Sequence, residues 1–95
     1  MREVKVGVVG CGYMSQLAHI PSLLAAEGSK VAALCDFRED LARELCRRHD
    51  IPRAVNNVET LLELDLDAVF VLTPVQCHYG LIQAAARSGK RVFTE

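Results

Sequence analysis

The fold of this chain is decided by residues 4–12, VKVGVVGCG. The first six of these, Val4 to Val9, are rich in β-branched side chains, which favours a β-strand. Glycine at positions 10 and 12 then ends the strand in a tight turn. From Tyr13 to Ala26 the apolar residues recur at helical spacing, so the turn is expected to open a helix. A strand, a glycine turn and a helix in this order begin a βαβ unit.

Two further residues shape the expected helix over 13–26. Pro21 lies inside it and is expected to bend it, because proline lacks a backbone donor and clashes with the preceding turn. Gly28 follows it and is a common signal for the end of a helix.

The rest of the chain repeats the alternation of strand and helix. Strands are expected over residues 30–35, 68–72 and 91–94, with a short one at 54–55, and helices over 38–49, 57–64 and 78–88. This order indicates an α/β fold, a parallel sheet of right-handed βαβ units with helices on both faces. The sheet is expected to be incomplete at its C-terminal edge, because no helix follows the last strand.

Composition and charge exclude several classes of protein. The chain has 95 residues, of which 51% are hydrophobic and 24% charged, as in one small globular domain. A net charge of −1 without a basic stripe speaks against nucleic-acid and membrane partners, and no stretch is long and apolar enough to span a bilayer. The four cysteines, Cys11, Cys35, Cys46 and Cys77, are scattered. Their spacing predicts neither a metal site nor a disulfide framework and indicates a cytoplasmic protein.

The glycine turn has the pattern of a phosphate-binding loop. In Gly10-x-Gly12-x-x-Ser15, the first glycine permits the tight turn and the second lets the backbone approach a pyrophosphate. The helix that follows offers free N–H groups to the phosphates. Ser15 replaces the usual third glycine or alanine and is small enough for close helix–strand packing. The alternative is a turn without a ligand, because glycines end strands for many reasons.

Asp36 ends the second expected strand, where a carboxylate can accept hydrogen bonds from both hydroxyls of an adenosine ribose. Its charge would repel a 2′-phosphate, so we expect NAD as the cofactor, with NADP less favoured. Arg38 complicates this expectation, because an arginine can pair with such a phosphate. Asp36 could also serve as the N-cap of the helix that begins near Arg38, and the two roles are compatible.

The segment Thr73-Pro74-x-x-x-His78 follows the strand expected over residues 68–72. Open α/β sheets bind ligands at this end of their strands. The alternative is structural: Pro74 ends the strand, and His78 is a polar residue in the first turn of a helix.

Other polar residues and thiols are weaker candidates. Cys11 is interpreted as a small spacer between the glycines, although a helix N-terminus can lower the pKa of a thiol. Direct activation of Cys77 by His78 is not expected, because adjacent residues on a helix point in different directions. Asp65 and Asp67 precede a strand without a His or Glu cluster, which predicts a solvated turn and no metal site.

Four segments in order resemble the N-terminal domain of the glucose-fructose oxidoreductase/inositol dehydrogenase (Gfo/Idh/MocA) family. They are residues 8–14 (VVGCGYM), residues 31–36 (VAALCD), the Thr73-Pro74…His78 segment, and residues 84–95 (AAARSGKRVFTE). The resemblance covers essentially the whole chain and implies a Rossmann-type fold. It also implies that residues 1–95 are one truncated dinucleotide-binding domain without its substrate domain. In the family the last segment continues as Glu-Lys-Pro, and the lysine takes part in catalysis.

The resemblance also implies roles for individual residues. Gly10, Gly12, Tyr13 and Met14 would hold the pyrophosphate. Thr73, Pro74 and His78 would line the crevice toward the nicotinamide, and Glu95 would lie by the nicotinamide ribose. Val75 departs from the family, in which an asparagine is common there. With Cys11 and Arg38 included, the expected cofactor-binding set is Gly10, Cys11, Gly12, Tyr13, Met14, Asp36, Arg38, Thr73, Pro74, His78 and Glu95. No catalytic residue is expected within the chain.

The function implied is hydride transfer between nicotinamide and a sugar, cyclic polyol or related carbonyl compound. The small-molecule substrate would bind to the full-length protein, and a homo-oligomer is expected because the last strand leaves an apolar edge. One alternative is a non-enzymatic NAD-binding module or an inactive fragment. Another is a methyltransferase that binds S-adenosylmethionine, but it gives no reason for the Thr73-Pro74…His78 segment or for residues 93–95.

Overall fold

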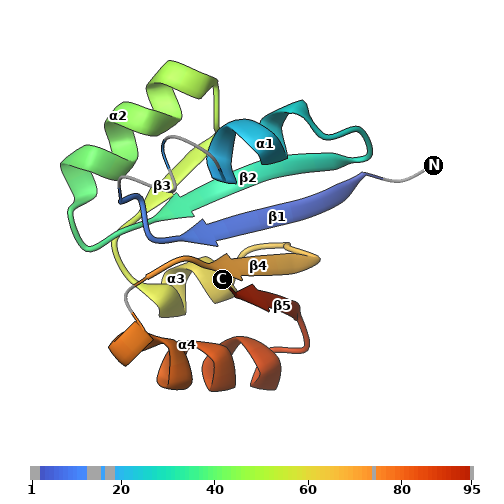
Figure 1. The fold of residues 1–95 in the computed structure, drawn as a ribbon, viewed down its shortest axis with the longest axis vertical. Coiled ribbons are helices and arrows are strands. Elements are labelled where there is room, and N and C mark those ends of the chain that lie inside the picture. The colour runs from blue at the N-terminus through green and yellow to red at the C-terminus, as the bar shows by residue number, and fades with distance from the viewer. Residues whose placement is uncertain (1–2, 13–15, 17–18, 74, 95) are drawn as a thin grey trace.

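A computed structural model describes residues 3–12, 16, 19–73 and 75–94, and for residues 75–79 the backbone alone. Strands and helices alternate along these residues (Figure 1). The elements are β1 (Val4–Val9), α1 (Ile20–Ala25), β2 (Ser29–Cys35), α2 (Glu39–His49), β3 (Arg53–Val55), α3 (Val58–Leu62), β4 (Ala68–Val71), α4 (Val75–Arg87) and β5 (Arg91–Thr94). The predicted α/β alternation is therefore confirmed, the short third strand included.

The five strands form one sheet in the order β3-β2-β1-β4-β5. Every pair of neighbours is parallel, and β1 lies at the centre between β2 and β4. The chain therefore first builds β1, β2 and β3 outward in one direction and then crosses to β4 and β5 on the other side. Open α/β sheets bind ligands where the strand order reverses, which in this sheet is at the carboxyl ends of β1 and β4.

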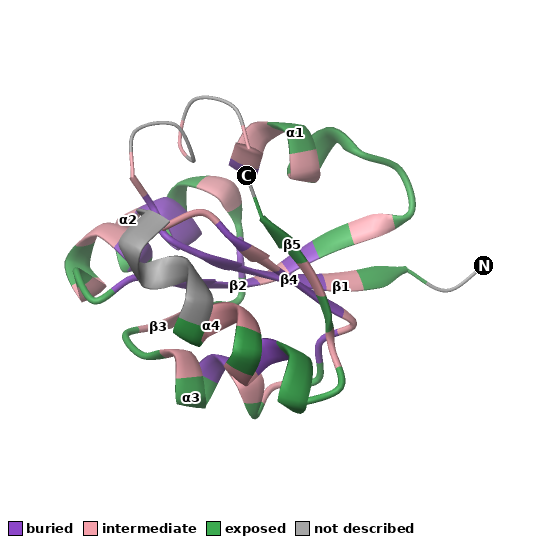
Figure 2. Ribbon diagram, turned by 60° about the horizontal axis from the view of Figure 1, so that its bottom comes forward, coloured by how far each residue is buried: buried purple, intermediate pink, exposed green. Residues whose placement is uncertain are grey.

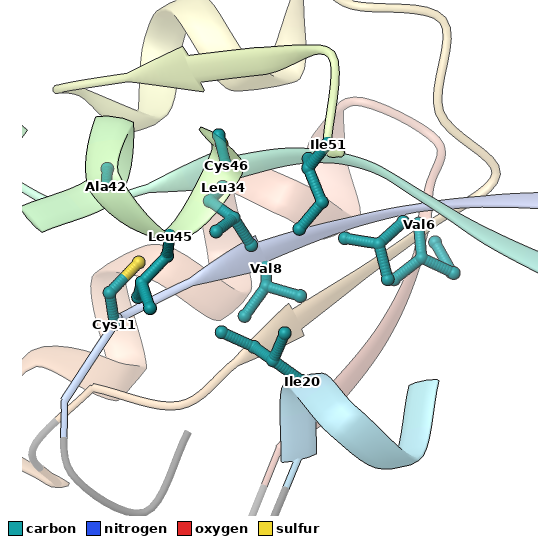
Figure 3. Close-up of a cluster of buried hydrophobic side chains, with 11 residues drawn as sticks. Val6, Val8, Cys11, Ile20, Leu34, Ala42, Leu45, Cys46 and Ile51 are labelled. Atoms are coloured by element: carbon teal, nitrogen blue, oxygen red, sulfur yellow. The ribbon is translucent and has the colours of Figure 1, made fainter. Parts of the chain in front are cut away.

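Helices cover the two faces of the sheet, α1 and α2 on one and α3 and α4 on the other (Figure 1). The three central strands β1, β2 and β4 are largely buried between them, whereas the edge strand β5 is mostly exposed (Figure 2). The core under α1 and α2 centres on Val8, Ile20, Leu34 and Leu45 (Figure 3). The core under α3 and α4 centres on Val9, Ala33, Leu61, Val69 and Val71. Strands buried on both faces explain why their sequences are apolar almost throughout.

One helix start differs from the sequence prediction, and another falls partly outside the described residues. Gln16 and His19 are in π-helical conformation, and the regular α-helix α1 runs from Ile20 to Ala25 with Pro21 in its first turn. Proline is tolerated there because the first N–H groups of a helix have no intrahelical partner. The expected bend at Pro21 stays a prediction. Helix α4 begins at Val75 and not at His78. His78 therefore lies three residues after the first residue of the helix. Most of the predicted helix over 13–19 lies outside the described residues.

The predicted N-cap of α3 is confirmed, and the turn predicted at Asp65 and Asp67 makes contacts that the sequence did not predict. Asn57 caps α3, because its side-chain oxygen accepts a hydrogen bond from the amide of Thr60 at 2.8 Å. This helix ends at Leu62, two residues before the predicted end. Asp67 accepts a hydrogen bond from the amide of Lys5 at 2.8 Å, and the side chain of Lys5 pairs with Asp65. These two acidic residues therefore join the starts of β1 and β4, at the edge of the sheet opposite the glycine turn.

Strands β3 and β5 are the two edges of the sheet. In β5, the ring of Phe93 stacks on Phe70 of β4 with centroids 4.8 Å apart, and Phe93 remains 46% exposed. Val92, on the opposite face of β5, packs against the core under α3 and α4. The C-terminal edge strand is thus packed on one face and open on the other.

Candidate cofactor site

The glycine turn is held between the ends of β2 and β4. The amide of Gly10 donates to the carbonyl of Cys35 at 2.8 Å, and the amide of Leu72 donates to the carbonyl of Val9 at 2.8 Å. These bonds extend the parallel pairing one residue beyond β1 on each side. They place the turn at the same edge of the sheet as Asp36, which follows β2, and Thr73, which follows β4.

Gly10 is required by the fold itself. Its φ is +104°, a conformation that residues with a side chain rarely adopt. A Cβ at this position would lie 2.9 Å from the carbonyl carbon and oxygen of Leu72 and 3.1 Å from the amide nitrogen of Thr73. All three atoms belong to backbone, which cannot move aside at small cost. The tight turn predicted at the first glycine is confirmed, and the structure adds its close approach to the backbone of Leu72 and Thr73.

Gly12 is not required by the fold in this way. It has no positive φ, and a Cβ built on it meets no atom of the described chain within 4 Å. The backbone there borders open space at the carboxyl edge of the sheet. A glycine in such a place leaves room for a ligand to approach the backbone, which is the role that the motif predicts.

Cys11 turns its side chain into the core and its amide toward Asp36. The thiol is fully buried and lies beside Leu45 of α2 (Figure 3). Burial, together with the negative charge of Asp36, raises the pKa of the thiol to about 12. The thiol is therefore protonated and unreactive at neutral pH, which agrees with the interpretation as a spacer and not with a nucleophile.

Asp36 is the centre of the site and is only 6% exposed. Its Oδ2 accepts from the amide of Cys11 at 2.8 Å, and its Oδ1 accepts from the amide of Arg38 at 2.9 Å. The guanidinium of Arg38 adds two more bonds, from Nε to Oδ1 at 2.9 Å and from Nη2 to Oδ2 at 3.0 Å. Burial by itself raises the pKa of Asp36, but these hydrogen bonds outweigh it and hold the pKa below its usual value.

The N-cap role considered for Asp36 is not what the structure has. Helix α2 begins at Glu39, and its N-cap position is occupied by Arg38, whose side chain makes no capping hydrogen bond. The carboxylate of Asp36 instead bonds the amide two residues on, as in an Asx turn, and reaches across to the glycine turn. It therefore joins β1 to β2 at the edge where the cofactor is expected.

Two residues at this edge were missed by reasoning from sequence. The side-chain amide of Gln16 donates to the carbonyl of Cys11 at 2.9 Å, while its backbone amide donates to the carbonyl of Gly12 at 3.0 Å. Phe37 is 85% exposed, and the guanidinium of Arg38 lies 5.7 Å from the centre of its ring. The sequence offered a signal for each. Gln16 is a polar residue one turn after the glycine motif, and Phe37 is an aromatic residue directly after Asp36.

The nicotinamide side of the expected site is described in less detail. Thr73 follows β4 and lies next to the glycine turn, as the contact with Gly10 shows. The backbone of His78 is part of helix α4. Pro74, Tyr13, Met14 and Glu95 lie outside the described residues, and so does the side chain of His78. Over the described residues, no group of His, Cys, Asp or Glu side chains is placed to hold a metal ion.

Comparison with known proteins identifies the family. The family Gfo/Idh/MocA, described as "Oxidoreductase family, NAD-binding Rossmann fold", matches residues 4–95. The chain belongs to the Gfo/Idh/MocA family. This Gfo/Idh/MocA chain is 38% identical to inositol 2-dehydrogenase/D-chiro-inositol 3-dehydrogenase of Shouchella clausii, over 97% of the chain and 27% of the relative.

Two solved structures share the fold. A 3-ketoreductase from Actinomadura kijaniata, in complex with TDP-benzene and NADP, superposes with a TM-score of 0.92 at 33% identity, over 98% of this chain and 29% of that one. Scyllo-inositol dehydrogenase from Lactobacillus casei, with bound NAD(H) and scyllo-inositol, superposes with a TM-score of 0.91 at 22% identity, over 98% and 28%. The chain therefore spans less than a third of the length of the proteins it matches.

The residues of this Gfo/Idh/MocA domain fit a dinucleotide. A Cβ built on Gly12 meets no described atom within 4 Å, and the carboxylate of Asp36 accepts a hydrogen bond from the amide of Cys11 in the same turn, as a site for a pyrophosphate and its ribose would need. None of the helices in the described ranges is long and apolar enough to cross a membrane.

Proposed function

We propose that this chain binds NAD with its pyrophosphate on the Gly10–Gly12 turn and its adenosine ribose at Asp36. The observation that carries the proposal is the contrast within the turn, where Gly12 faces open space although its neighbours Gly10 and Cys11 are buried. A fold that needed only a turn would not require glycine at position 12. The amide of Cys11 fixes Asp36 beside the same space, as a ribose next to the pyrophosphate requires.

We further propose that the whole protein transfers hydride between nicotinamide and a sugar, a cyclic polyol or a related carbonyl compound. The relatives support this class, because they include an inositol dehydrogenase and a 3-ketoreductase. When bound, the dinucleotide supplies the hydride chemistry, and the residues of this chain supply binding and orientation. Thr73, Pro74, His78 and Glu95 are proposed to line the nicotinamide half, with Tyr13 and Met14 at the pyrophosphate.

The test is a calorimetric titration of the purified chain with NAD, NADP and S-adenosylmethionine. We expect NAD to bind more tightly than NADP, because an Asp36 carboxylate opposes a 2′-phosphate, and S-adenosylmethionine not to bind. The Asp36→Ala variant should narrow the gap between NAD and NADP. Binding of S-adenosylmethionine alone would contradict the proposal, and so would equal binding of NADP by the unmodified chain.

Assembly and location are part of the same proposal. We propose a homo-oligomer that covers the open face of β5, because Phe93 is a large apolar side chain on an edge strand. Sedimentation that shows a monomer over a wide concentration range would contradict it. Cys11, Cys35 and Cys46 are buried as free thiols, and this supports the proposed cytoplasmic location.

A further inference from the structure

The carboxylate of Asp36 is saturated with hydrogen bonds from its own chain. An ionised carboxylate offers about four lone-pair sites, and four donors reach this one. Two are the backbone amides of Cys11 and Arg38, and two are the Nε and Nη2 atoms of the Arg38 guanidinium. The ribose hydroxyls of a dinucleotide need acceptor sites on the same carboxylate. A donor must therefore leave before they can bind.

Only one of these donor groups is free to leave. The amides of Cys11 and Arg38 belong to the glycine turn and to the start of α2, and their movement would disturb the backbone around β1 and β2. The guanidinium is on a flexible side chain that is 52% exposed, whereas the side chain of Asp36 is 4% exposed. Arg38 therefore lies on the solvent side of the carboxylate and can swing away without unfolding anything. Its position over the exposed ring of Phe37 adds a weak contact that holds it closed.

We propose that Arg38 is a latch that occupies the ribose subsite on Asp36 and must open before a dinucleotide can bind. Once open, the same guanidinium carries its five donors into the space beside the ribose, where it can pair with a 2′-phosphate. Its closed state therefore competes with NAD, and its open state assists NADP. Arg38 thus lowers the preference for NAD over NADP that Asp36 by itself would impose. This inference rests on the proposed dinucleotide site and gives Arg38 a second role there, as a competitor for the ribose position.

The inference predicts changes of opposite sign for the two cofactors. The variant Arg38→Met removes the two guanidinium donors and the charge but keeps the backbone amide and an unbranched apolar stem beside Phe37. We expect its Kd for NAD to fall by up to about fivefold, the range that a half-exposed ion pair allows. We expect its Kd for NADP to rise by about tenfold or more, because charge-assisted bonds to the phosphate are lost. A purely structural role for Arg38 would move both constants in the same direction.

The matched control is Arg43→Met. Arg43 lies on α2, is exposed, and pairs with Glu39 on the surface, so this variant loses the same charge away from the site. Both Kd values should stay within about twofold of the wild type, as expected for a surface pair. Arg38→Lys keeps the charge without the two-pronged contact, and its Kd for NAD should lie between those of the wild type and Arg38→Met.

The measurement is isothermal titration calorimetry of NAD and NADP with each variant, after circular dichroism has shown that all of them fold alike. Tighter NAD binding together with weaker NADP binding in Arg38→Met supports the latch. Unchanged or weaker NAD binding in that variant overturns the latch but leaves the dinucleotide site standing. If neither the wild type nor Arg38→Met binds either dinucleotide, the proposed function itself is wrong, and the latch with it.

Discussion

Gly10 and Gly12 are the two ends of one turn, and the fold constrains them differently. At the inner end, Gly10 has a φ of +104° and lies so close to the backbone of Leu72 that a Cβ would be 2.9 Å away. At the outer end, Gly12 has neither a positive φ nor any described atom within 4 Å of a built Cβ. The first glycine therefore serves the protein's own packing, and the second is the place where we propose that a ligand approaches the backbone.

This difference separates stability from function within three residues. Cys11 between the two glycines belongs to both sides, because its thiol fills the core while its amide binds Asp36. A substitution at the inner end should act on folding, and one at the outer end should act on binding. The following substitutions test how sharp that division is.

The largest effect is expected for Gly10→Ala. The substitution adds backbone strain at positive φ to a clash with the backbone of Leu72, and together these should lower the free energy of unfolding by about 3 kcal/mol or more. Urea denaturation followed by circular dichroism measures the loss. A variant of Gly10 that unfolds at the wild-type urea concentration would show that the turn can rearrange, and the comparison with Gly12 would then fail.

Gly12→Val should lose binding and keep the fold. Its branched side chain enters the space proposed for the pyrophosphate, so NAD should bind about a hundredfold more weakly or worse, because charge-assisted hydrogen bonds to the phosphates are lost. Calorimetry with NAD measures the first effect and urea denaturation the second. The control is Gly80→Ala, an exposed site in α4 where a Cβ also meets nothing, and it should bind NAD normally. Normal binding by the Gly12 variant would mean that the turn holds no ligand.

An intermediate effect is expected at Gly7 in β1, where side chains and not backbone limit the space. A Cβ there would lie 2.7 Å from Cδ1 of Leu66 and 3.1 Å from Cδ1 of Leu61. Because these are the ends of flexible side chains, Gly7→Ala should cost about 1–2 kcal/mol, less than Gly10→Ala. In the double variant with Leu66→Val the two costs should partly cancel, as measured by a double-mutant cycle in urea. Strict additivity would show that Leu66 does not limit Gly7.

The smallest effect concerns pH and the carboxylate that joins the turn to β2. Because hydrogen bonds depress the pKa of Asp36 in the folded state, its contribution to stability is present above pH 3.8, the ordinary value, and is lost as the pH falls through the lower folded value. The free energy of unfolding of the wild type minus that of Asp36→Asn should therefore shrink below pH 3.8. A difference that stays constant with pH would show that the bonds to Asp36 do not favour its charged form.

Much of the fold could be predicted because it depends on local patterns. The β-branched run before Gly10, the apolar runs that became β2 and β4, and the capping residue Asn57 act over a few neighbouring positions. The start of α4 was predicted less well. Helix α4 begins at Val75, where a preceding proline in the sequence is compatible with the first turn. The residue at which a helix begins depends on how the helix packs against the sheet, and the local sequence pattern does not contain that information.

The sequence by itself determined the α/β alternation, the glycine turn and the acidic residue at the end of β2, because each follows from short-range backbone and side-chain preferences. Only the tertiary structure decided that Gly10 must be glycine against Leu72, that the thiol of Cys11 is buried, and that Arg38 covers Asp36. These facts depend on contacts between β1, β2 and β4, which lie far apart along the chain. The distance between two residues on different strands is set by the register and packing of the sheet. It therefore cannot be predicted from their separation along the chain.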